Sequence, residues 1–266
     1  MITLPFAAAL AAAVLSTAFL SGVFGMVGGL ILMGILLAIM PVAGAMVLHG
    51  MTQMASNGWR AWLWRAHVNW PIAGVYVAGA LAAALVMALA RVMPSKPVAL
   101  IILGLIPFVG LLLPTRWAPD LTRRADAFGT GAVCTLLMLV AGVSGPILDV
   151  CFVRSNLDRK QLVATKATVQ MLGHFLKVAY FGQVLAIGGA EVAPMAVLLA
   201  VVLAIAGTQL SRPVLDALSD RQFRTWSRRL IVTTAAVYLI QGLYLLVVDL
   251  RGVAQAVAAL AVTSLS

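Results

Sequence analysis

The sequence predicts an all-α polytopic membrane protein built from two inverted repeats. Of the 266 residues, 63% are hydrophobic and only 10% are charged, and the mean hydropathy is +1.07. Soluble domains carry about 25% charged residues. Apolar runs of roughly 17–25 residues, the length that a bilayer core requires, recur along the whole chain. The short alternating segments of an outer-membrane barrel do not occur in it.

Ten apolar segments can be placed, and two of them are short. The short pieces, 29–40 and 146–153, cannot cross ~30 Å of hydrocarbon at about 1.5 Å per residue. Each follows a glycine-rich break, "SGVFGMVGG" at 21–29 or "AGVSGP" at 141–146, and each either crosses with its neighbour or re-enters the membrane. The first long run has no basic residue before it, so we expect a retained helix and not a signal peptide. The long segments are 2–21, 43–59, 69–90, 98–114, 127–143, 161–181, 192–211 and 230–248.

The distribution of charge predicts which loops face the cytoplasm. Thirteen of the 18 Lys and Arg residues lie in the loops 60–67, 115–126, 154–160 and 212–229, and basic loops of membrane proteins face the cytoplasm. This places the N-terminus outside. The net charge of +10 therefore follows from membrane topology, and we expect no binding to nucleic acid.

The same assignment predicts the organisation of the chain. Each half is a long-plus-short helix hairpin followed by three transmembrane helices, and this odd number of crossings makes the second half start on the opposite side. We expect a first repeat at 1–115, a cytoplasmic linker at 116–126, a second repeat at 127–250 and an apolar C-terminal tail at 251–266. The stretch 253–265 is expected to lie along the outer interface.

Two of the predicted helices carry polar stripes. Residues four apart share a helix face, and "TQMASNGWR" at 52–60 can be aligned with "VQMLGHFLK" at 169–177. Polar groups at the bilayer centre cost roughly 2.5–3.5 kcal/mol on insertion scales, so they face a protein interior or a water-filled cavity. Hydrogen bonding between helices is the alternative role. The stripes are His49, Gln53 and Asn57 on the first helix, and Lys166, Gln170 and His174 on the second.

Charge and glycine breaks together predict a central anion site. Lys166 has no acid in its own helix, so we expect it to be unpaired. The breaks place Gly25, Gly28 and Gly29, and Ser144 with Gly145, at the starts of the two short helices. Helix starts carry free N–H groups that favour anions, and discontinuous helices in matching positions indicate a transport site. A GxxxG-like packing surface is the alternative interpretation.

These motifs resemble the TauE/SafE family of sulfite and organosulfonate exporters, also called the toluene-sulfonate uptake permease family. The family typically has a "GxGGG"-like break and a helix beginning near "AxATS"; here the corresponding stretches read "GVFGMVGG", "GVSGPI" and "LVATKATVQ". The resemblance spans the chain and implies a secondary transporter of the inner membrane. Its substrate would be sulfite, an organosulfonate or a related sulfur-containing or carboxylate anion, moved by alternating access of the two halves. The second break lacks the glycine triplet, and Lys166 stands where a serine is common.

Coupling and other functions remain alternatives. His49, His174 and Asp149 are candidates for proton coupling, since His titrates near neutrality; sodium is the other coupling ion considered. A copper(I) transporter using His49, Met51 and Met54 is the alternative function. We expect no enzyme, cofactor or resident metal, because no Walker, GxSxG or HExxH sequence occurs. A homodimer stays open.

Overall fold

The computed structural model describes residues 4–155, 157–188 and 192–263. In these residues the regular elements are helices, as the sequence predicts, and no strand occurs. The elements are α1 (Leu4–Phe24), α2 (Val27–Ile39), α3 (Val42–Leu63), η1 (Arg65–His67), α4 (Trp70–Ala90), α5 (Lys96–Leu112), η2 (Thr115–Trp117), α6 (Arg124–Ala141), α7 (Gly145–Arg154), α8 (Arg159–Ile187), α9 (Pro194–Leu210), α10 (Arg212–Ala217) and α11 (Asp220–Thr263).

The predicted apolar segments correspond to α1–α9 and α11, and α10 is an additional short helix in the predicted loop 212–229. By length and composition α1, α4, α6 and α11 are candidate membrane spans, while α2, α5 and α9 are shorter apolar helices. Helices α3 and α8 carry the polar stripes, which lower their hydropathy. The arrangement confirms an all-helical polytopic membrane protein.

The two short helices begin inside the bundle. Between α1 and α2 the chain passes Gly25 at φ +71°, and after α6 it passes Gly142 at φ +82°. Glycine adopts this left-handed conformation without strain, so each residue lets the chain reverse. Most residues of α2, including Leu30 and Met33, are buried. With 13 and 10 residues, α2 and α7 are only about 20 and 15 Å long, so neither crosses a bilayer alone.

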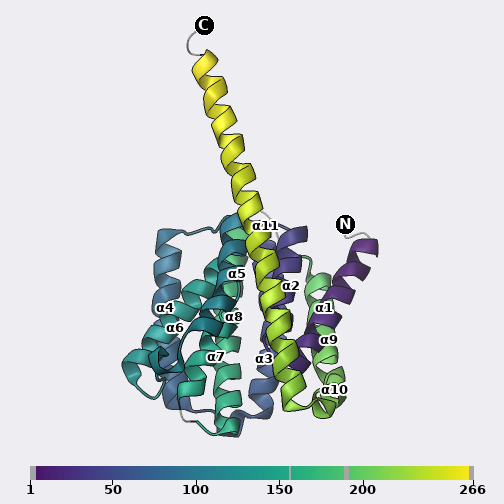
Figure 1. Ribbon diagram of the computed structural model, residues 1–266, viewed down its shortest axis with the longest axis vertical. Helices are drawn as coiled ribbons and strands as arrows, with labels where there is room; N and C mark the ends of the chain where they lie inside the picture. Colours follow the sequence, from purple (N-terminus) through teal and green to yellow (C-terminus); the bar gives the residue numbers. More distant parts are fainter. Residues whose placement is uncertain (1–3, 156, 189–191, 264–266) are drawn as a thin grey trace.

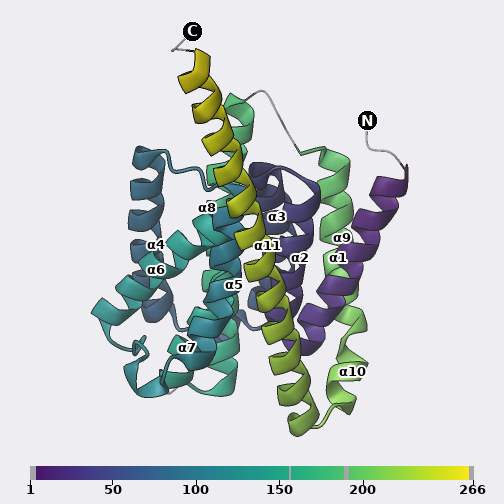
Figure 2. The same ribbon diagram turned by 45° about the horizontal axis from the view of Figure 1, so that its top comes forward.

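The two halves of the chain are interlocked. Helix α3 packs along α8 at the centre, α1 along α9, α4 along α6, and α5 along α11; Figures 1 and 2 show these pairs side by side. The α5–α11 pair is close because Gly104 and Gly242 lack side chains: a methyl group on either would lie 2.7 or 2.9 Å from the backbone of the other helix. Each pair joins a helix of the first half to one of the second, so the most extensive helix packing runs between the halves.

The ends of the molecule differ in charge. The connections that contain the four basic loops lie toward the lower end in Figure 1, and both termini lie at the upper end. Helix α11 rises from the lower end and continues beyond the other helices as far as Thr263. The described part of the stretch 253–265 continues the α11 helix without a break, and its position at the outer interface stays a prediction.

Candidate functional site

A cavity of about 30 Å³ lies where α2, α3, α7 and α8 meet. We call it the central cavity. It brings together side chains that are far apart in the sequence, and its volume suits about one water molecule. Its lining consists of Met26, Gly29, His49, Gln53, Met138, Val143, Ser144, Gly145, Gln170 and His174.

Both short helices start at this cavity. Neither Met26, which precedes α2, nor Ser144, which precedes α7, forms a side-chain cap. The first N–H groups of a helix lack partners within the helix and carry the positive end of its dipole. The two polar stripes cover these starts in the same way. A methyl group at Gly29 would lie 3.3 Å from the Gln53 amide, and one at Gly145 would lie 3.6 Å from Gln170 Nε2.

Two lining residues carry buried polar atoms that lack a well-formed hydrogen bond within the described part of the chain. Nδ1 of His174 belongs to a side chain that is 4% exposed, and Oγ of Ser144, whose residue is 1% exposed, lies within reach of the Cys134 thiol. Buried polar groups in proteins are almost always paired, and an unpaired one costs about 1–3 kcal/mol. Nδ1 of His174 therefore leaves a hydrogen-bonding position open beside the central cavity, which a polar ligand could fill.

Lys177 places a buried amine beside the cavity. It is fully buried on α8, and its Nζ lies 2.8 Å from His49 Nδ1 and donates to the Gly142 carbonyl at 2.9 Å. Because Nδ1 of His49 accepts this bond, Nε2 is the ring donor, and it lies 2.9 Å from the Gly29 carbonyl. The His49 and His174 ring centroids are 5.5 Å apart. Within the described residues no carboxylate pairs with Lys177.

The expectation that Lys166 is unpaired is wrong. Its Nζ forms an ion pair with Asp149 of α7, and neither residue lines the central cavity. The sequence places Asp149, Asp158 and Glu191 near Lys166 but outside its helix, and the fold brings Asp149 of the neighbouring helix into contact with it. Lys177 could have been found from its spacing, because Gln170, His174 and Lys177 follow one another by four and three residues on one face.

Three other predicted residues lie away from the cavity lining. Asn57 is buried, and its Nδ2 donates to the Gln53 carbonyl of its own helix at 3.0 Å. Gly25 forms the turn before α2. Gly28 faces α1, where an added methyl group would collide with the Thr17 carbonyl. Gly28 therefore packs two helices together, which is the alternative that the glycine-rich break left open.

A family model described as sulfite exporter TauE/SafE matches residues 9–240 of the chain. The chain belongs to the TauE/SafE family. This TauE/SafE protein is therefore a multi-pass membrane transporter and not an enzyme, and its family supports a sulfite or sulfur-anion exporter in general. No curated protein and no solved structure matches the chain.

The copper alternative is not favoured in this TauE/SafE protein. Both ring nitrogens of His49 already have partners, and Met51 packs against the apolar core. Among the residues placed by the structure, no three His, Cys, Asp or Glu side chains gather in a metal-binding group.

Proposed function

We propose that the protein exports a small anion, namely sulfite, an organosulfonate or a related carboxylate, by alternating access around the central cavity. The observation that carries this proposal is the meeting, in one cavity, of two uncapped helix starts with the amides of Gln53 and Gln170 and with the unpaired buried Nδ1 atom of His174. The helix starts supply N–H donors for oxygen atoms. The hydroxyl of Ser144 and the amides of Gln53 and Gln170 supply further donors.

Lys177 gives the central cavity a positive electrostatic potential. Charged groups buried without a counter-ion cost several kcal/mol, and an anion in the adjacent cavity would offset part of that cost. The amine acts through His49, whose ring lies between Lys177 and the cavity. No carboxylate is present among the described lining residues, so the field in the cavity favours anions over cations.

We further infer that the halves are inverted repeats in the inner membrane, with the N-terminus outside. The helix pairings support this, because α1 packs on α9 as α6 packs on α4, while α3–α8 and α5–α11 pair corresponding helices. Because helices of the two halves are paired with one another, the halves are not expected to move as separate bodies during alternating access. The moving units would be groups such as α1 with α9 and α4 with α6, each drawn from both halves, and not the halves themselves.

A proton is the coupling ion that the geometry favours. His49 and His174 line the central cavity, and Lys177 faces His49 from α8. A proton on either ring would change the charge beside a bound anion. Asp149 is less favoured, since it is paired with Lys166 outside the lining. Sodium is less favoured because the described lining offers no carboxylate.

The test is uptake of radiolabelled sulfite into inside-out membrane vesicles, where uptake reports export. We expect saturable uptake by wild type that increases with an imposed proton gradient. Gln170→Ala removes a cavity amide and is expected to lower kcat/KM about tenfold, the effect of losing one hydrogen bond to a charged group.

The matched control is Gln183→Ala on the exposed side of the same helix, which is expected to transport like wild type. Absence of saturable uptake of sulfite, sulfonates and carboxylates by folded wild type would contradict the proposed function. Equal loss in both variants would show that the central cavity is not the site.

A further inference from the structure

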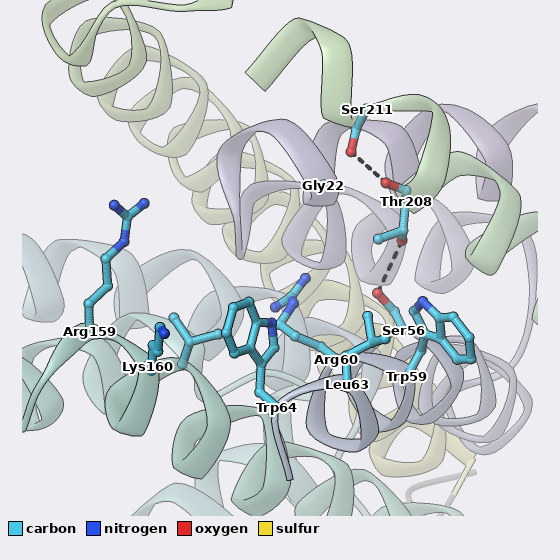
Figure 3. Close-up of a pocket in the computed structure, with 11 residues that line it drawn as sticks. Gly22, Ser56, Trp59, Arg60, Leu63, Trp64, Arg159, Lys160, Thr208 and Ser211 are labelled. Carbon is cyan, nitrogen blue, oxygen red and sulfur yellow. Dashed lines mark hydrogen bonds between the residues drawn. The ribbon is translucent and has the colours of Figure 1, made fainter. Parts of the chain in front are cut away.

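A second cavity, of about 830 Å³, opens near the end of the molecule that carries the basic loops. We call it the basic cavity. It is formed by the ends of α1, α3 and α9 and by the start of α8 (Figure 3). Its volume falls in the range of small-molecule sites, about 300–1,000 Å³. Its lining consists of Gly22, Ser56, Trp59, Arg60, Leu63, Trp64, Arg159, Lys160, Val163, Thr208 and Ser211.

The charge of this lining has one sign. Arg60 of α3 and the pair Arg159 and Lys160 of α8 are the charged residues of its described lining, which includes no carboxylate. Clefts lined by one sign of charge focus the electric field and concentrate counter-ions. An arginine guanidinium also matches the geometry of an oxyanion with two parallel N–H bonds. The lining therefore suits a ligand that carries an oxyanion group.

The other lining residues complete a site for such a ligand. Figure 3 shows Trp64 beside Arg60, between the basic pair of α8 and the hydroxyl groups of Ser56 and Thr208. The two hydroxyl oxygens are 3.3 Å apart and join α3 to α9. Trp and Leu side chains offer apolar surface for the rest of an organic anion. The hydroxyls already donate within the protein, Ser56 to Thr208 and Thr208 to the Ala204 carbonyl, so the donors for an oxyanion are the basic side chains.

The basic cavity lies in line with the central cavity along α3. Gln53 lines the central cavity, whereas Ser56 and Arg60 line the basic cavity. Arg60 is seven residues beyond Gln53, about 10 Å along the helix axis. An anion bound near Arg60 would therefore be about two helical turns from the central cavity, on the side that charge bias assigns to the cytoplasm.

The second half has no open cavity at the positions that align with Arg60 and Gly22 in the described structure. In the alignment of 52–60 with 169–177, Lys177 corresponds to Arg60, and the glycine breaks align Gly142 with Gly22. Lys177 is fully buried and donates to the Gly142 carbonyl, whereas Arg60 and Gly22 line an open cavity. Of these two aligned basic side chains, only Arg60 lines an open cavity.

We propose that the basic cavity is an oxyanion-binding vestibule, separate from the central cavity, which receives the exported anion from the cytoplasmic side. The proposal rests on the proposed function for its direction of transport. The same oxyanion chemistry is carried by the head group of an anionic phospholipid, so the experiment includes an arm for each source.

The experiment measures sulfite transport by the full chain in inside-out proteoliposomes of phosphatidylcholine. Arg60→Gln and the double variant Arg159→Gln/Lys160→Gln are each expected to raise KM about tenfold, the effect of one charge-assisted hydrogen bond, with kcat within about twofold of wild type. Arg60→Lys keeps the positive charge but lacks the two parallel N–H donors of the guanidinium group, so it should show an intermediate KM. The matched control is Arg65→Gln, because Arg65 belongs to the same basic loop but stacks on Trp62 and does not line the basic cavity.

The outcomes separate the two proposals. If wild type transports sulfite but the Arg60 and Arg159/Lys160 variants keep its KM, the vestibule is wrong and the proposed function stands. If folded wild type transports no anion, the proposed function itself fails. If Arg60→Gln alters only the dependence of transport on added phosphatidylglycerol, and not KM in phosphatidylcholine, the basic cavity binds lipid head groups and the vestibule is overturned. Equilibrium binding of sulfite that is weakened in Arg60→Gln but unchanged in Arg65→Gln supports the vestibule.

Discussion

The amine of Lys177 has two neutral partners, the Nδ1 atom of His49 and the Gly142 carbonyl. The amine of Lys166 has a charged partner, Asp149, and is partly exposed. These two lysines of α8 therefore differ in their electrostatic effect. A compensated ion pair adds little field at a distance, whereas a buried cation without a carboxylate keeps its field in a low dielectric. Under the proposed function, Lys177 and not Lys166 is the side chain whose charge favours an anion in the central cavity.

Replacing the two lysines should separate their roles. Lys177→Met keeps the apolar stem but leaves His49 Nδ1 and the Gly142 carbonyl without their donor, and we expect kcat/KM for sulfite to fall by at least about tenfold. Lys166→Met removes only the partner of Asp149, and KM should stay within about twofold of wild type. The measurement is initial sulfite flux at equal amounts of folded protein. If both variants lost kcat/KM equally, Lys166 would contribute to anion binding as much as Lys177 does.

At the scale of elements, the two adjacent glycines of α2 have different functions. Gly28 packs against the backbone of α1, where an added methyl group would collide with the Thr17 carbonyl. Gly29 faces the flexible side chain of Gln53 and lines the central cavity. One glycine therefore allows the helix to pack, and the other leaves room at the helix start for a ligand.

Alanine at each position should distinguish packing from binding. Gly28→Ala overpacks a backbone contact, so we expect it to lower the free energy of unfolding by about 1–3 kcal/mol, seen as a lower Tm of the detergent-purified protein. Gly29→Ala should keep nearly the wild-type Tm, because Gln53 can move, while KM for sulfite rises several-fold. A wild-type KM in Gly29→Ala would show that the start of α2 does not contact the anion.

Sequence reasoning succeeded where the signal is local. Apolar length identified the helices, and the glycine breaks identified the starts of α2 and α7, because both depend on neighbouring residues. The stripes placed His49 and Gln53 together with Gln170 and His174 in one cavity lining. The pairing of Lys166 with Asp149 and the packing of α1 on α9 depend on contacts between distant segments. Helix periodicity carries no information on which faces meet, so these features could not be predicted.

At the scale of the whole molecule, the two ends differ in accessibility. Trp64 lines the basic cavity and is 38% exposed, whereas Phe181, its aligned counterpart in the second half, is fully buried. On the closed side, Tyr180 also links α8 to the end of α4 through its bonds to Val92 and Met87. Under the alternating-access proposal this is a state open toward the cytoplasm and closed outside.

Single cysteines can measure that asymmetry in a background where the buried Cys134 and Cys151 are replaced by alanine. A cysteine replacing Trp64 should react quickly with an impermeant maleimide added to the cytoplasmic face. One replacing Phe181 should react at least about tenfold more slowly with the same reagent added outside, because opening that face requires breaking the Lys177 and Tyr180 contacts. An outward-directed sulfite gradient should then raise the Phe181→Cys rate and lower the Trp64→Cys rate, since a cycling transporter shifts its population toward the outward-open state. Rates that respond at neither position, in vesicles that transport sulfite, would show that transport does not alternate between these two faces.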